Sequence, residues 1–155
     1  MKIYYKRLKE VQPPLVTAKG DWFDLYTPKE QDIEIESGEV KLVHLGIAMR
    51  IPKGMEAILA FRSSTGLAYG IGPASGIGVI DQSYSGNNDE WKFPVRAYVR
   101  AVIPVDTCIV QFRIQPSQKA NIFQKIFWFF SNTVKLVEVD DLGDNNRGGF
   151  GSTGK

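Results

Sequence analysis

Apolar and polar side chains alternate with a period of two along most of the chain. The alternation runs through residues 33–35, 43–49, 55–61, 95–103 and 108–114, and more weakly through 134–139. Such a period puts the apolar side chains of a strand on one face. Strands that recur roughly every 8 to 12 residues, with turns such as residues 51–54 between them, are typical of a β-sandwich or jelly roll. The pattern lacks a strand–helix–strand rhythm, which excludes a Rossmann or P-loop layout.

Two segments depart from this alternation and predict helices. The hydroxyls of Ser63, Ser64 and Thr65 can cap a short helix that continues through Tyr69. A second helix is expected over about residues 121–130, and it is apolar on every side, unlike a solvated surface helix. Because exposed aromatic clusters associate, this helix should pack on its own assembly or meet a partner. Packing on its own assembly is preferred, since aromatic residues more often belong to a core.

Composition places the chain among single-domain globular proteins. It has 155 residues, of which 43% are hydrophobic and 23% are charged, close to ordinary averages. Its 19 basic and 17 acidic residues leave a net charge of +2, and no basic run is long enough to follow a nucleic-acid backbone. Nucleic acid is therefore not expected as a partner.

The remaining composition bears on compartment and metals. Cys108 is the single cysteine and the Met1 end has no apolar signal region, so a cytoplasmic location is expected. The longest apolar run, residues 126–130, is far short of the roughly 20 residues of a membrane helix, so no membrane association is expected. With one histidine, His44, the chain lacks the ligands for an ordinary structural zinc site.

Glycine is concentrated in two places. Six glycines lie within residues 66–86, and five lie within the last 13 residues. The tail from residue 144 holds Arg147, Phe150, two hydroxyls and glycine N–H groups that can form an anion-binding nest. Composition alone favours a disordered terminus. The donor set also suits a lid that closes over an anionic, ring-bearing ligand.

Four further groups of residues carry candidate chemistry, each with a plain structural alternative. Arg62 with the hydroxyls that follow it suits an anion at a helix start, or an ordinary capped helix. Residues 76–86 read as a β-hairpin that exposes Asp81 and Tyr84, or as a turn with a capping aspartate. Gln111 interrupts an apolar alternation, which often marks only a solvent face, and Asp24 has an alternative as a turn residue.

Taken in order, these stretches resemble the five motifs of the trimeric dUTP pyrophosphatase (dUTPase) family over residues 20–154. The third and fifth motifs together carry the resemblance, and the pieces at 20–22 and 88–91 are most similar to the Bacillus and phage branch. The matching positions, from motif one to motif five, are Asp24-Leu25, Arg62-Ser63-Ser64, residues 78–81 with Tyr84 and Gly86, Asp106 with Gln111, and residues 147–154.

The resemblance implies an all-β chain, a distorted jelly-roll β-barrel with one short helix, assembled as a homotrimer with a flexible C-terminal arm. The body would span residues 1–143, with an apolar insertion at about 118–132, and the arm residues 144–155. Each active site would draw on all three chains. The implied reaction is Mg²⁺-dependent hydrolysis of dUTP to dUMP and pyrophosphate.

The resemblance also implies individual roles. Asp81 would be catalytic, activating the water that attacks the α-phosphorus, and Asp24 would assist the metal through water. Tyr84 would pack under the sugar, Arg147 would reach the γ-phosphate and Phe150 would stack on uracil. The implied substrate-binding set is Arg62, Ser63, Ser64, Gly76, Ile77, Gly78, Val79, Ile80, Tyr84, Gln111, Arg147, Phe150, Gly151 and Ser152.

Three alternatives stay open. Only two residues separate Arg147 from Phe150 where many relatives have four, so Trp91 or Phe93 could supply the uracil stack instead. A dCTP deaminase-type enzyme has the same fold. A phage-type regulator would use that fold as a nucleotide-gated binder of another protein. Separately, the apolar stretch Ile122–Phe130 is a candidate contact surface for a protein partner.

Overall fold

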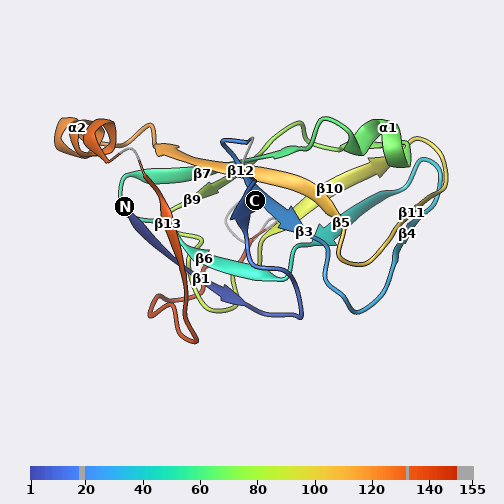
Figure 1. Cartoon of the computed structure of the whole chain (residues 1–155), viewed down its shortest axis with the longest axis horizontal. Coiled ribbons are helices and arrows are strands. Elements are labelled where there is room, and N and C mark those ends of the chain that lie inside the picture. Colours follow the sequence, from blue (N-terminus) through green and yellow to red (C-terminus); the bar gives the residue numbers. More distant parts are fainter. Residues whose placement is uncertain (18–19, 132, 150–155) are drawn as a thin grey trace.

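The computed structural model of the chain describes residues 1–17, 20–131 and 133–149, which form short strands and two helices (Figure 1). The helices are α1 (Thr65–Tyr69) and α2 (Ile122–Phe130). The strands are β1 (Lys2–Arg7), β2 (Leu15–Val16), β3 (Phe23–Tyr26), β4 (Ile33–Ile35), β5 (Val40–His44), β6 (Ile47–Arg50), β7 (Met55–Phe61), β8 (Ile71–Pro73), β9 (Gly78–Asp81), β10 (Lys92–Ala97), β11 (Ala101–Ile103), β12 (Cys108–Pro116) and β13 (Lys135–Glu138).

The strands form four small sheets. The largest has the order β2-β3-β12-β7-β9, and β12 pairs antiparallel with both β3 and β7. The others have the orders β13-β1-β6, β5-β10-β8 and β11-β4. The mostly-β expectation is confirmed. The expected closed barrel is wrong for the described part of the chain, because none of these sheets closes on itself.

Two of the predicted continuous strands are broken. Gly46, with a left-handed φ of 66°, divides the alternation at 43–49, so β5 joins β10 while β6 joins β1 in a different sheet. Trp91 bridges the break, since its N–H donates to Ile47 and its carbonyl accepts from Leu45. The alternation at 95–103 likewise divides into β10 and β11. Period-two patterning is local, and it does not record where a strand changes partner.

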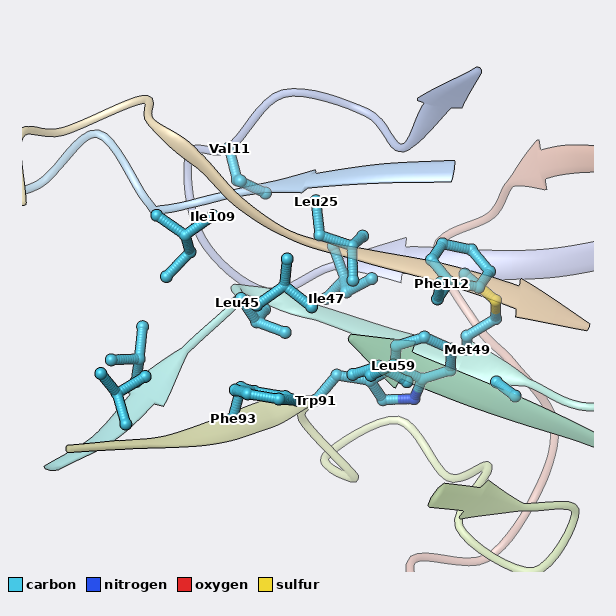
Figure 2. Close-up of a cluster of buried hydrophobic side chains, with 14 of the residues drawn as sticks. Val11, Leu25, Leu45, Ile47, Met49, Leu59, Trp91, Phe93, Ile109 and Phe112 are labelled. Carbon is cyan, nitrogen blue, oxygen red and sulfur yellow. The ribbon is translucent and has the colours of Figure 1, made fainter. Parts of the chain in front are cut away.

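The core lies between these sheets and is rich in aromatic and branched side chains (Figure 2). Trp91, Phe93 and Phe112 are fully buried, and the Trp91 ring meets Phe112 edge-on with 5.1 Å between centroids. Edge-to-face packing of this kind adds about 0.5–1.5 kcal/mol to the burial of the two rings. Trp91 and Phe93, the alternative residues for stacking on uracil, are therefore part of the core.

Helix α1 begins differently from the prediction. Ser64 precedes it with a helical backbone and makes no side-chain cap, so the expected serine cap is wrong. Thr65 is buried instead, and its hydroxyl donates to the Ile109 carbonyl at 3.1 Å. The helix ends at Gly70, whose φ of 63° suits a glycine C-cap.

With α2, the described part of the chain has two helices, whereas the family resemblance implied one. Asn121 and Gln124 form a reciprocal capping box at its start. The Gln124 amide also donates to the Lys53 carbonyl, and Trp128 packs against the core. None of its nine residues is buried, so the packing expected from its composition is not made within one chain. Figure 1 places α2 at the end of the molecule opposite α1. In the described residues, no helix is long and apolar enough to cross a membrane.

Candidate active site

Asp81 is the last residue of β9, the strand at one edge of the five-stranded sheet. It lies opposite Glu56 of β7. Its carboxylate accepts hydrogen bonds from the backbone N–H of Ser83 at 2.8 Å and from the Ser83 hydroxyl. The Arg147 guanidinium also donates to it, with Nη1 and Oδ2 2.9 Å apart. Residues 66 positions apart in sequence thus meet at one exposed carboxylate.

These contacts decide the charge of Asp81. Partial burial raises its pKa, but the hydrogen bonds from Ser83 and the Arg147 charge outweigh burial and lower the pKa below the ordinary 3.8. Asp81 is therefore ionised at neutral pH. Its side chain remains 50% exposed, so a ligand or water can reach it.

Residues 76–86 do not form the predicted hairpin. Gly76 has a left-handed φ of 76°, and the following strand, β9, pairs antiparallel with β7 instead of with a neighbour in sequence. Ile77 and Val79 are exposed, whereas Gly78 and Ile80 are half-buried. Because β9 ends the sheet among the described strands, one row of its main-chain N–H and C=O groups is open to a planar partner.

Tyr84 is not the exposed phenol that the sequence predicted. Its side chain is 8% exposed, and its hydroxyl donates to the Glu90 carbonyl at 2.7 Å. Burial, with the charges of Asp89 and Glu90, raises the pKa of this phenol. Tyr84 is therefore held in place through its hydroxyl, and it carries no negative charge at neutral pH.

A second cluster lies at the other end of β7. Asp24 is in the middle of β3 and only 4% exposed, so the alternative as a turn residue is wrong. The Arg62 guanidinium faces it, with 3.3 Å from Nε to Oδ1. Gln111 lies directly across from Asp24 in the β3–β12 register, half-buried, and its amide donates to the Phe61 carbonyl at 3.3 Å.

Ser63 and Ser64 complete this second cluster from the segment between β7 and α1. Both are exposed, and the Ser64 hydroxyl does not cap the helix. Cys108 lies nearby, and burial together with the Asp24 charge raises the pKa of its thiol to about 12. The cluster therefore offers hydroxyl, amide and guanidinium donors, while its thiol stays protonated.

The two clusters are too far apart to meet on one chain. Asp81 lies opposite Glu56, whereas Arg62 follows the last residue of β7. At about 3.3 Å per residue, the six steps from Glu56 to Arg62 cover roughly 20 Å. That separation exceeds the length of a triphosphate, so a ligand bound at Asp81 does not reach the donors of Arg62 in the same chain.

Three of the predicted site residues, Phe150, Gly151 and Ser152, lie outside the described residues. The alternative stacking residues Trp91 and Phe93 are both fully buried, and neither offers a free face to a ligand. Sequence reasoning missed Ser83 as a support of the site. The signal for Ser83 was its position two residues after Asp81 in a turn, where a hydroxyl can bond back to the carboxylate.

A cavity of about 590 Å³ opens beside Asp81. It extends from Asp81 and Arg147 to Lys53 and Glu56 on the β6–β7 side and to Gln124 of α2. Within residues 1–17, 20–131 and 133–149, no group of three or more His, Cys, Asp or Glu side chains could hold a metal ion.

Comparison with known proteins gives a family match and a relative of nearly the same length. Residues 13–154 match the dUTPase family model. The SPbeta prophage-derived deoxyuridine 5'-triphosphate nucleotidohydrolase of Bacillus subtilis is 41% identical over 155 residues, covering 99% of each chain.

Solved structures are similar at lower identity. The dUTPase of phage phi11 of S. aureus, which coordinates a structural Mg(II) ion, is 16% identical with a TM-score of 0.66, covering 77% of this chain and 94% of its own. The dUTPase of Staphylococcus bacteriophage 80alpha, solved with dUpNHpp, is 17% identical with a TM-score of 0.63, covering 77% of this chain and 93% of its own. It belongs to phage dUTPases that control transfer of virulence genes.

Proposed function

The chain belongs to the dUTPase family, and we propose that it hydrolyses dUTP to dUMP and pyrophosphate. Its activity class is that of a dUTP diphosphatase. The reaction would keep uracil out of DNA and supply dUMP for thymidylate synthesis. The observation that carries this proposal is the ionised Asp81 carboxylate, which is half-exposed, held by Ser83 and within hydrogen-bond distance of the Arg147 guanidinium.

Asp81 is the general base of the proposed reaction. A water held by its carboxylate attacks the α-phosphorus, the bond from that phosphorus to the bridging oxygen of pyrophosphate breaks, and the water proton passes to Asp81. A carboxylate with a low pKa is a weak base, so we assign it only about 10²- to 10⁴-fold of the rate. Positioning and charge neutralisation supply the remainder, as in other phosphoryl transfers.

The nucleoside is recognised by the edge of β9 and by Tyr84. Open main-chain groups from Gly76 to Ile80 pair with uracil as a second base would, and the close fit excludes the methyl group of thymine. The Tyr84 ring packs under the deoxyribose and leaves no room for a 2′-hydroxyl. Its fixed position, with its hydroxyl bonded to the Glu90 carbonyl, suits this exclusion.

The triphosphate is held by donors from both clusters. Since the Arg62 cluster is roughly 20 Å from Asp81 along a strand, Arg62, Ser63, Ser64 and Gln111 act on substrate bound at another copy of the chain. This separation supports a homotrimer with shared sites. The arm, residues 144–155, closes over the substrate, with Arg147 at the γ-phosphate, Phe150 on uracil, and Gly151 and Ser152 as further donors.

Mg²⁺ fits the residues that are present. It retains several waters and is bound by substrate phosphates with one or two carboxylates, so an all-protein cage is not required. The triphosphate would hold the ion, with Asp24 contributing through water. When bound, Mg²⁺ neutralises charge that develops on the phosphates.

Pyrophosphate release from dUTP, dTTP, dCTP and UTP with Mg²⁺ tests the proposal. We expect turnover of dUTP alone, and its absence would contradict the function. Incubation with dCTP, followed by detection of deaminated nucleotide, separates the dCTP deaminase alternative.

The exposed apolar surface of α2 supports a second role as a protein-binding regulator through Ile122–Phe130. Its aromatic side chains include Phe123, Phe129 and Phe130, each between 77% and 78% exposed. Phe123→Ser with Phe129→Ser changes exposed positions outside the cavity lining, so it should leave dUTP turnover intact and abolish such an interaction. A double variant that left every interaction unchanged would remove this role.

A further inference from the structure

Ser85 is a buried hydroxyl residue just after the turn that begins at Asp81. It is 2% exposed, and its hydroxyl donates to the Gln82 carbonyl at 2.9 Å. The same oxygen accepts the backbone N–H of Ile51, in the β6–β7 turn (residues 51–54), at 3.1 Å. Ile51 is 3% exposed, so water does not compete for this hydrogen bond. One buried hydroxyl therefore connects two segments that are 34 residues apart in sequence.

Gln82 makes a second connection between the same two segments. Its side-chain oxygen accepts the backbone N–H of Gly54 at 2.7 Å. Gly54 has a left-handed φ of 80°, which ends the β6–β7 turn and directs the chain into β7. Both connections use main-chain N–H groups of the β6–β7 turn. The segment after Asp81 is therefore fixed to backbone, which moves less than a surface side chain does.

These connections bear on the Asp81 carboxylate through Ser83. The turn of residues 81–84 is closed by the N–H of Tyr84, which donates to the Asp81 carbonyl at 3.1 Å. Gln82 and Ser83 are the two central residues of this turn. The N–H and the hydroxyl of Ser83 both donate to the Asp81 carboxylate. Holding Gln82 therefore holds Ser83 where it orients the carboxylate.

The other side of the β6–β7 turn is held by the segment that leads into α2. The N–H of Ser117 donates to the Gly54 carbonyl at 2.9 Å. The Gln124 amide donates to the Lys53 carbonyl at 3.1 Å. A Cβ added to Gly54 would collide with the Gln124 side chain, so α2 begins directly against this turn. The β6–β7 turn is thus bonded to the Asp81 turn on one side and to α2 on the other.

We propose that Gln82 and Ser85 are positioning residues that fix the Asp81 carboxylate against the β6–β7 turn, which Gln124 supports from α2. This role rests on the proposed function, because it acts through Asp81. A general base has to stay within hydrogen-bond distance of the proton that it accepts, and a displacement of about 1 Å can cost about 10²-fold in rate. A turn bonded to the body of the protein at two points limits such a displacement.

Ser85→Ala tests the buried connection. It leaves the Ile51 N–H and the Gln82 carbonyl without the hydroxyl, and we expect kcat for dUTP to fall up to about tenfold with KM changed less than about threefold. Burial raises the pKa of Asp81, and the hydrogen bonds from Ser83 lower it. Loosening the turn should therefore also move the acid limb of kcat/KM to higher pH. An unchanged kcat with an unchanged pH profile would overturn the proposal.

Ile35→Val is the control for lost stability. Ile35 is fully buried in β4, which belongs to the separate β11-β4 sheet. Shortening a buried isoleucine costs about as much stability as losing one hydrogen bond. Urea denaturation should show similar losses for Ile35→Val and Ser85→Ala, while only Ser85→Ala should lose turnover. Equal losses of turnover would indicate general destabilisation and would overturn the positioning role.

Gln82→Met and Gln82→Glu form a matched pair at an exposed position, where both variants should fold. Methionine keeps the length of the side chain but offers the Gly54 N–H only a weak acceptor, whereas glutamate keeps an acceptor oxygen. On the plateau of the pH profile, kcat should fall about fivefold in Gln82→Met and less than about twofold in Gln82→Glu. Equal kcat values would overturn the connection to Gly54. If Ser85→Ala does not fold, this pair decides the proposal.

Gln124→Glu tests the support from α2. The carboxylate can still accept from the Asn121 N–H in the capping box, but it cannot donate to the Lys53 carbonyl. We expect kcat to fall about two- to threefold, a smaller loss because Ser117 still holds the turn. Unchanged turnover would overturn the part of the proposal that reaches α2.

Hydrogen exchange separates failure of this role from failure of the proposed function. The N–H groups of Ile51 and Gly54 are bonded to Ser85 and Gln82, so exchange at residues 50–55 reports on both connections. Without nucleotide, exchange there should be several-fold faster in Ser85→Ala than in Ile35→Val. Equal exchange in the two variants would overturn the proposal. Failure of the proposed function would appear instead as absent dUTP turnover by the unmodified chain, with the difference in exchange still present.

Discussion

The Asp81 cluster and the Asp24 cluster are opposite in construction. Asp81 is half-exposed, is held by a turn hydroxyl and one arginine, and belongs to an edge strand. Asp24 lies inside the same sheet, with a side chain 5% exposed and ion-paired to Arg62. A carboxylate that acts on a water molecule has to be accessible, as at an edge strand. A carboxylate that only orients an arginine can be buried next to that arginine. The contrast in exposure supports the proposed division of roles, in which the first cluster carries the chemistry and the second holds phosphates.

Asp81→Asn should produce the largest effect. The amide cannot accept the proton from water, so we expect kcat to fall at least about 10²-fold while dUTP binding is retained. Steady-state kinetics and calorimetry with the imido analogue measure the two quantities. Near-normal turnover would remove Asp81 from the catalytic role and with it the contrast between the clusters.

Mixing Asp81→Asn chains with Arg62→Ala chains should restore activity that neither variant has alone. If one chain's Asp81 works with another chain's Arg62, about a quarter of the sites in a randomly mixed trimer contain both intact residues. Turnover after joint refolding measures the recovery. A mixture as inactive as its components would contradict the sharing of sites.

Stability should separate the two arginines. Arg62→Ala leaves Asp24 buried without its partner and should lower the free energy of unfolding by about 1–3 kcal/mol. Arg147→Ala leaves an exposed Asp81, and the loss should stay below about 1 kcal/mol. Urea denaturation of both variants checks the difference. Equal losses would show that the two ion pairs do not differ in burial in solution.

Ser83→Ala should change the pH profile with little change in stability. The Ser83 hydroxyl helps to lower the pKa of Asp81, so its removal raises that pKa. Because protonation inactivates the base, the acid limb of kcat/KM should move to higher pH. Ser37→Ala, a serine bonded to the Tyr98 carbonyl away from the site, is the control. An unmoved limb would mean that Ser83 does not tune Asp81.

Phe129→Ser with Phe130→Ser should have the smallest effect. These exposed side chains contact each other and not the cavity beside Asp81, so turnover should change less than about twofold and stability by about 0.5 kcal/mol at most. A clear loss of activity would extend the Asp81 region to the outer surface of α2.

Much of the local structure was predictable from the sequence. The turn at residues 51–54 closes as expected, with the N–H of Met55 bonded to the Pro52 carbonyl. Helix α2 has its predicted extent because its signals are local, with Asn121 and Gln124 capping its first turn. The candidate residues of the five motifs were identified by type and order. Their division into two clusters was not, because distance within a sheet depends on which strands pair.

The sequence by itself determined the all-β patterning, the capped α2 and the presence of donors suited to a nucleoside triphosphate. Only the tertiary structure decided that β9 pairs with β7, that Tyr84 is buried, and that the Ser85 hydroxyl bonds Ile51, a residue 34 positions away. Alternation and capping depend on residues that are close together in the chain, so a short stretch of sequence is enough to predict them. A buried hydroxyl is stable only where polar groups converge on it, and folding alone brings the distant ones there.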